Sequence, residues 1–227
     1  MKSFKKYQAL ALAFGTASFA SATVIVEDWQ FNTPGDNEGW TANAFTVANL
    51  HVGPAVSGSE TVLTSDNLQN QADPKIFFPN EVIALPVGST GWDQLVIRIR
   101  QIGDDGVTPV AFNNVGSFAM LGTTPWGTLE FIDGDTGDGD LVPVTQVTES
   151  DEWNIFTYDL SEYTSGSISG GPRLDPIQGN DIGGGVIQGN FEIDYVTLTA
   201  NSIPEPGQTS LLIGAALLGW MAYRRRM

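Results

Sequence analysis

The side chains able to do chemistry in this chain are mostly carboxylates. The sequence has one histidine, His51, no cysteine, and 26 acidic residues against ten basic ones, for a net charge of -16. Thiol enzymes, cysteine-ligated zinc sites and disulfide scaffolds are therefore excluded. The negative charge also excludes a nucleic-acid binder held by phosphate contacts. Carboxylate chemistry, binding of divalent cations and recognition by hydrogen bonds remain.

The sequence gives no clear catalytic pattern. His51 lies between Leu50 and Val52 in an alternating strand pattern, and no Gly-x-Ser-x-Gly nucleophile motif accompanies it. A glycosidase needs two carboxylates at a suitable separation, and no pair stands out among so many. A polysaccharide lyase would use Arg98 or Arg100, yet no companion base has a defined spacing. We expect a protein that is not an enzyme, with a polysaccharide-active enzyme as an alternative.

A carbohydrate site needs an aromatic platform and planar polar groups. Arg98 and Arg100 are predicted to project from one face of a strand, and Trp126, in a Thr-Thr-Pro-Trp-Gly turn, is the tryptophan expected at the surface. Trp92 is the second choice. We predict Arg98, Arg100 and Trp126 as the ligand contacts. The alternative for both arginines is pairing with surface carboxylates.

The other two tryptophans considered, Trp40 and Trp153, lie within motifs that are typical of fold packing rather than of ligand contact.

Short β-rich runs separated by Gly, Pro, Asn and Asp position these side chains. In the run 95–101, Leu95, Ile97 and Ile99 face one side and Arg98 and Arg100 the other, which indicates a strand with one buried and one solvated face. Helical periodicity is nearly absent. The spacing predicts an all-β fold, a single β-sandwich or jelly roll. Its strands are predicted at 24–29, 44–52, 61–64, 75–78, 95–102, 110–112, 118–121, 129–132, 142–147, 153–158 and 191–199.

The last predicted strand carries an acid among apolar residues. Strict alternation places Asp194 on the same face as Val196 and Leu198, where a buried carboxylate would need a partner.

The N-terminus has the three parts of a secretory signal peptide. Lys2, Lys5 and Lys6 are followed by the apolar stretch 9–19 and by small residues that end at Ala22. We expect cleavage after Ala22. An N-terminal membrane anchor is the alternative, but the apolar run is too short to span a bilayer.

The C-terminus has an apolar run at 211–223, preceded by a Pro-Glu-Pro tripeptide and followed by three arginines. The tripeptide, the run and the basic end stand in the order of the PEP-CTERM sorting signal of diderm bacteria, which this tail resembles. The prolines break an entering helix, and the arginines favour the cytoplasmic side. The residues that carry the motif are Pro204, Glu205, Pro206, Arg224, Arg225 and Arg226.

This resemblance implies recognition by an exosortase-type transpeptidase, transient attachment to the membrane, and delivery to the cell surface or extracellular matrix. The segment 209–223 would rise only about 22 Å as a helix, which is marginal for a permanent span. A simple tail anchor is the alternative. The predicted organisation is a signal peptide (1–22), a β-sandwich domain (23–201) and a sorting signal (202–227).

Between the two ends, residues 23–203 carry 25 acidic and four basic side chains, for a net charge of -21. This charge favours divalent cations and repels anionic surfaces, so we expect no nucleic-acid partner.

Much of the central segment resembles the galactose-binding-domain-like β-sandwiches that include many carbohydrate-binding modules. The resemblance rests on the order of loose motifs: Gly-Asp-Asn-Glu-Gly-Trp ending at Trp40, the segment 153–160, Gly-Ser-Ile at 166–168, Arg-Leu-Asp-Pro at 173–176, and Glu-Ile-Asp-Tyr-Val at 192–196. It implies that the last strand returns beside the first. It also implies a structural calcium ion, held by Asp194 with Glu27 or Asp28. The alternative is that Asp194 accepts local hydrogen bonds.

A second acidic cluster, at 133–140, departs from the EF-hand spacing and has no glutamate at the twelfth position. We interpret it as a solvated turn, with a weak calcium site as the alternative.

The sequence therefore predicts an exported, non-catalytic surface or matrix protein that binds extracellular polysaccharide. A structural matrix protein without a discrete ligand is the main alternative.

Overall fold

The fold is described from a computed structural model. It describes residues 22–43, 47–68, 75–80, 82–103, 105–111, 116–124, 127–133, 140–141, 144–169, 173–174, 176, 190–202, 218, 220–221 and 223–224. The chain divides into two compact units. Thr23–Asn201 forms one, and Met1–Ala22 with Ser202–Met227 forms the other.

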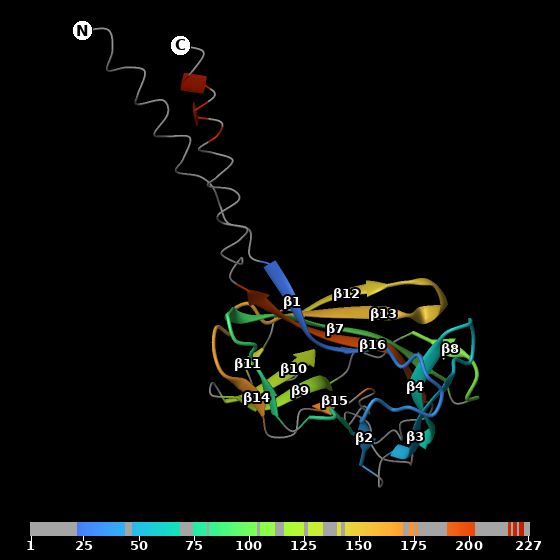
Figure 1. The fold of residues 1–227 in the computed structure, drawn as a ribbon. Coiled ribbons are helices and arrows are strands. Elements are labelled where there is room, and N and C mark those ends of the chain that lie inside the picture. The colour runs from blue at the N-terminus through green and yellow to red at the C-terminus, as the bar shows by residue number, and fades with distance from the viewer. Residues whose placement is uncertain are drawn as a thin grey trace. The chain divides into compact units, whose positions relative to one another are not determined.

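Within the larger unit the described residues form an all-β structure of two sheets, as the sequence predicts. The first, sheet 1, has the strand order β12-β13-β7-β16-β4-β3, with β1 beside β16 and β8 beside β7 (Figure 1). Its strands are β1 (Ala22–Trp29), β3 (Val47–Pro54), β4 (Thr61–Leu68), β7 (Ser89–Ile102), β8 (Pro109–Val110), β12 (Val144–Thr148), β13 (Asn154–Asp159) and β16 (Asn190–Ser202).

The second sheet, sheet 2, has the order β11-β10-β9-β15-β5-β2, and β14 pairs with both β9 and β6. Its pairings are mostly antiparallel, but β11 lies parallel to β10 and β14 parallel to β9. Its strands are β2 (Thr41–Ala42), β5 (Ile76–Phe77), β6 (Val82–Ala84), β9 (Gly116–Thr124), β10 (Gly127–Asp133), β11 (Asp140–Leu141), β14 (Ser167–Ser169) and β15 (Arg173–Leu174).

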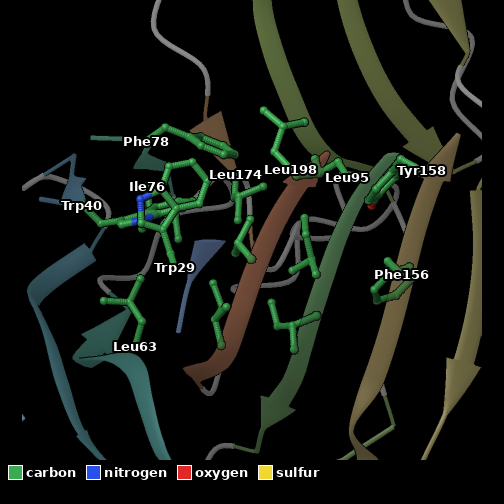
Figure 2. Packing of buried hydrophobic residues seen from close by; sticks show 14 of the residues in the cluster. Trp29, Trp40, Leu63, Ile76, Phe78, Leu95, Phe156, Tyr158, Leu174 and Leu198 are labelled. Atoms are coloured by element: carbon green, nitrogen blue, oxygen red, sulfur yellow. The ribbon is translucent and has the colours of Figure 1, made fainter. Parts of the chain in front are cut away.

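One hydrophobic core draws side chains from both sheets, which gives the unit its sandwich-like character. Leu95, Ile97 and Ile99 of β7 are fully buried, as their alternation predicts, and Ile76 and Leu174 contribute from sheet 2. Burying a side chain of this size contributes about 1.5–3 kcal/mol. In Figure 2, Leu95 of β7 lies near Tyr158 of β13, whereas Ile76 and Leu174 lie nearer to the tryptophans.

Aromatic rings fill another part of the same core. The Trp40 and Phe78 ring centroids are 4.4 Å apart, and Trp29 meets Trp40 edge to face at 5.3 Å (Figure 2). Such pairs contribute about 0.5–1.5 kcal/mol beyond the area they bury. Trp40 is therefore a core residue, as its motif predicts.

The last strand departs from the predicted alternation. Ile193 and Val196 both belong to the core, so the buried face shifts by one residue at Asp194 and Tyr195. The prediction that Asp194 shares a face with Val196 and Leu198 is therefore wrong. A one-residue slip moves Asp194 to the face opposite the core.

Near the C-terminus, residues 218, 220, 221, 223 and 224 have helical backbone conformation. Among the residues that the structure describes, no helix has the length and apolar character needed to cross a membrane. The Pro-Glu-Pro motif, Arg225 and Arg226 lie outside the described residues.

Candidate functional site

The polar side chains of interest gather on the outer face of sheet 1, the face opposite the core. Antiparallel pairing places His51 of β3 opposite Thr64 of β4, and Thr64 opposite Glu192 of β16. Glu192 in turn binds Arg100 of β7. A row of polar groups thus crosses four neighbouring strands, because residues in register share one face of a sheet.

At the centre of this face two guanidinium groups contact one indole ring. The guanidinium carbons of Arg98 and Arg100 are 4.3 and 4.4 Å from the centre of the Trp153 ring. Trp153 is only 2% exposed. Both faces of a ring can attract cations, and each desolvated contact contributes up to about 2 kcal/mol. Trp153 is a packing residue, as predicted, and it packs on the outer face of sheet 1.

Arg100 is fully buried, and five polar contacts engage its guanidinium. Nε and Nη2 contact Oε2 of Glu192 at 2.8 and 2.6 Å. Nη1 donates to Ser57 Oγ at 2.9 Å and to the Asp151 carbonyl at 3.3 Å, and Nη2 donates to the Ser57 carbonyl at 2.9 Å. A guanidinium has five N–H donors, and these contacts match that number. Arg100 therefore braces the fold and has no exposed surface for a ligand, which corrects its prediction as a ligand contact.

Arg98 is partly exposed and also paired. Its Nη1 donates to Asp194 Oδ2 at 2.7 Å, and its Nε donates to Glu149 Oε2 at 2.9 Å. Partial burial is the largest influence on the pKa of Arg98 and acts to lower it, but Asp194 and Glu149 together raise the pKa. Arg98 thus follows the predicted alternative of pairing with surface carboxylates, whereas the partner of Arg100 is a buried carboxylate. The 16% exposure of the Arg98 side chain leaves an edge open to solvent.

A pocket of about 320 Å³, which we call the first pocket, opens on the same face beside this stack. Its polar lining consists of His51, Thr64, Ser65, Asp66, Asn190 and Glu192. Hydroxyl, amide, imidazole and carboxylate groups supply both donors and acceptors of hydrogen bonds.

The histidine of the first pocket is held in place by its neighbours. His51 Nδ1 lies 2.9 Å from the Asn49 carbonyl oxygen and 3.5 Å from Asp66 Oδ1. A proton on Nδ1 satisfies the carbonyl and leaves Nε2 of the neutral ring as an acceptor. A Cβ on Gly53 would lie 3.2 Å from the imidazole, so glycine gives the ring room to lie over β3.

The alcohols of the first pocket already have acceptors. Thr64 Oγ1 donates to the Phe191 carbonyl at 2.7 Å, and Ser65 Oγ donates to Asn190 Oδ1 at 2.8 Å. Asn190 also donates to the Ser65 carbonyl. These bonds join β4 to β16 and fix the rotamers of the lining side chains. The result is a preorganised polar surface.

A second pocket, of about 470 Å³, lies on the same face near the start of β7. Thr157 pairs with Val96, and Asp159 pairs with Gln94. Val96 and Gln94 lie two and four positions before the outward-facing Arg98, so these pairs share its face of the sheet. Hydrogen bonding by the Ser161 side chain and backbone lowers the pKa of Asp159. The lining consists of Asp93, Gln94, Thr145, Thr157, Asp159 and Ser161.

The carboxylates predicted to hold calcium have protein partners. Asp194 pairs with Arg98, Asp28 Oδ1 accepts from Thr197 at 2.8 Å, and Glu27 Oε1 accepts from Asn80 at 3.1 Å. Among the described residues, no three Asp, Glu, His or Cys side chains form a group suited to a metal ion. The Asp28 to Thr197 bond does place the first strand beside the last.

The two tryptophans considered as an aromatic platform differ in whether the structure describes them. Trp92 is 1% exposed and packs in the core, so its expectation as a surface residue is wrong. Trp126 lies outside the described residues, as do residues 134–139 of the second acidic cluster.

Sequence reasoning missed the pocket residues. Asn190 and Asp66 lie 124 positions apart and meet only through the β4–β16 pairing. The available signal was His51 on an alternating strand, next to a second strand rich in Thr, Ser and Asp.

No family model matches this chain, and comparisons with curated proteins and with solved structures found no significant match.

Proposed function

We propose that this protein is an exported, non-catalytic carbohydrate-binding module of the cell surface or extracellular matrix. The observation that carries the proposal is the first pocket, because its fixed amides, carboxylates and imidazole suit the many hydroxyls of a sugar. Ligand pockets typically have volumes of about 300–1,000 Å³, and the first pocket falls within this range.

Non-catalytic binding is favoured over hydrolysis by the hydrogen bonds inside the first pocket. Thr64 and Ser65 donate their hydroxyl protons to Phe191 and Asn190, so neither alcohol is oriented toward His51 as a nucleophile would be. Glu192 Oε2 accepts a hydrogen bond from Arg100, and its Oε1 accepts one from the Val56 amide at 2.7 Å, so both carboxylate oxygens are already engaged within the protein.

The finer part of the fold proposal is a jelly-roll topology of the galactose-binding-like type. The hydrogen bond between Asp28 of the first strand and Thr197 of the last supports it, because that fold closes with these strands side by side.

Export is the second part of the proposal. The N-terminal signal, the Pro-Glu-Pro motif and the basic C-terminus support secretion followed by processing by an exosortase-type transpeptidase. Mass spectrometry of surface material tests this part. We expect an N-terminus at Thr23 and a C-terminus near Pro204–Pro206, whereas an intact precursor in the cytosol would contradict export.

A glycan array tests the binding function. We expect binding to neutral glycans, reduced at least tenfold by His51→Ala and by Asp66→Asn, whose side chains are 36% and 58% exposed and tolerate substitution. Glu162→Gln removes one exposed charge outside the first pocket and serves as the control. Trp126→Ala and Arg98→Ala test the two remaining sequence-based contacts. Absence of binding to every glycan would favour a structural matrix protein, and release of shortened glycans would favour an enzyme.

A further inference from the structure

The two pockets lie on one face of one sheet, and this arrangement bears on the size of the ligand. The face is defined by strand register. His51, Thr64 and Glu192 share it in the first pocket, and Thr157 and Asp159 share it in the second through their pairing with β7. Both pockets are therefore open to one extended molecule that lies across sheet 1.

The separation between the pockets follows from the length of β7. Asp93 of the second pocket lies near the start of this strand, and Gly103 of the first pocket directly follows its end. Ten residues of extended chain cover about 33 Å. A monosaccharide or disaccharide reaches one pocket only, and a longer linear chain reaches both.

Between the pockets the face remains polar and partly open. Arg98, Asp194 and Glu149 have side-chain exposures of 16%, 23% and 39%. The Arg98 guanidinium lies 4.3 Å from the centre of the Trp153 ring and pairs with both carboxylates, so the path between the pockets includes groups that can form hydrogen bonds.

Charge selects among linear polymers. Residues 23–203 have a net charge of -21, and both pockets include carboxylates, namely Asp66 in the first and Asp93 and Asp159 in the second. Uronic-acid and sulfated polymers are repelled by such a surface. Neutral sugars present only hydroxyls, which the amide, hydroxyl and carboxylate groups can bind.

We propose that the second pocket is a second carbohydrate subsite, and that the outer face of sheet 1 binds an internal stretch of a neutral, linear polysaccharide across both pockets. This inference rests on the proposed carbohydrate-binding function and adds the length and charge of the ligand. Two linked subsites raise affinity once a ligand is long enough to occupy both, because the second contact becomes intramolecular.

The test is isothermal titration of the full chain, in mild detergent, with neutral β-1,4-linked gluco- and manno-oligosaccharides from disaccharide to decasaccharide. We expect the affinity to rise roughly tenfold or more where the ligand becomes long enough to span both pockets. A double variant, Thr145→Val with Thr157→Val, removes two hydroxyls of the second pocket while keeping side-chain shape and strand propensity. It should abolish the rise and leave the affinity for short ligands unchanged.

A control variant, Val82→Thr, changes a 58% exposed side chain on β6 of sheet 2, away from the proposed binding face, and should behave as the wild type. Circular dichroism confirms that each variant is folded. Equal affinity for short and long ligands would overturn the second subsite, and so would an increase of affinity with ligand length that persists in the double variant. Either result leaves the binding function of the first pocket intact. Tighter binding of polyuronate than of neutral oligosaccharides overturns the charge selection. Failure of every oligosaccharide to bind contradicts both the inference and the proposed function.

Discussion

Replacing Arg100 by methionine tests the buried ion pair at the centre of sheet 1. The substitution keeps an unbranched chain of similar length but removes the contacts to Glu192, Ser57 and Asp151. Glu192, which is 1% exposed, keeps the Val56 amide and loses its cationic partner. Removing one member of a buried pair costs about 3–5 kcal/mol, because the other charge stays buried without compensation.

This cost is measurable by thermal and urea unfolding followed by circular dichroism. In a domain of this size, a loss of about 1 kcal/mol in the free energy of unfolding lowers the melting temperature by about 2–4 °C. We therefore expect the melting temperature of Arg100→Met to fall by about 6–20 °C. The double variant Arg100→Met, Glu192→Leu removes both charges and should recover most of the loss.

Arg98→Met is the matched control, because Arg98 contacts the same Trp153 ring. Its carboxylate partners keep contact with water, so we expect a cost of about 1–2 kcal/mol from the lost ring contact and exposed ion pairs. The reasoning is refuted if Arg100→Met costs no more than Arg98→Met, or if the double variant is less stable than Arg100→Met alone.

Three further predictions concern a turn, a loop and a metal ion. Gly39 has φ +84° and an added Cβ would lie 3.0 Å from Pro79, so Gly39→Ala should cost at least about 1 kcal/mol in urea unfolding; an unchanged midpoint would contradict this. Hydrogen bonds from the Thr108 side chain and from the Val107 and Thr108 amides lower the pKa of Asp105 below 3.8. The ionised carboxylate therefore stabilises the loop above pH 3.8, and this stabilisation is lost as the pH falls through the lowered pKa. An NMR titration midpoint of Asp105 at or above 3.8 would refute the effect of these hydrogen bonds. The proposed calcium ion predicts a higher melting temperature in millimolar calcium than in chelator, an effect reduced by Asp28→Asn, and equal temperatures in wild-type protein reject the ion.

The all-β fold and the core of β7 could be predicted because alternation of apolar and polar residues reports directly on burial. Leu95, Ile97 and Ile99 face the core as their spacing indicates. The one-residue slip at Asp194 in β16 was not predicted. The pattern of apolar and polar residues along one strand does not reveal an extra residue until the partner strands are known. Short strands such as β14 and β15 were missed for a related reason, because two or three residues show no periodicity.

The candidate site was less accessible to sequence reasoning. Arg98 and Arg100 were found as rare cations on one strand, but their burial depends on Trp153 and on the loop at Ser57, which only tertiary packing brings together. The first pocket joins the consecutive strands β3 and β4 to β16, which lies far along the chain from both. Apart from His51, its polar residues are common types, and only the register of β3, β4 and β16 brings them together.

The location of carbohydrate binding is the central claim, and NMR titration of the folded protein with a neutral oligosaccharide tests it directly. The account predicts amide shift changes concentrated on the pocket residues of β3, β4 and β16, among them Thr64, Ser65 and Asn190. Shift changes confined to sheet 2, or none at saturating oligosaccharide, would contradict it.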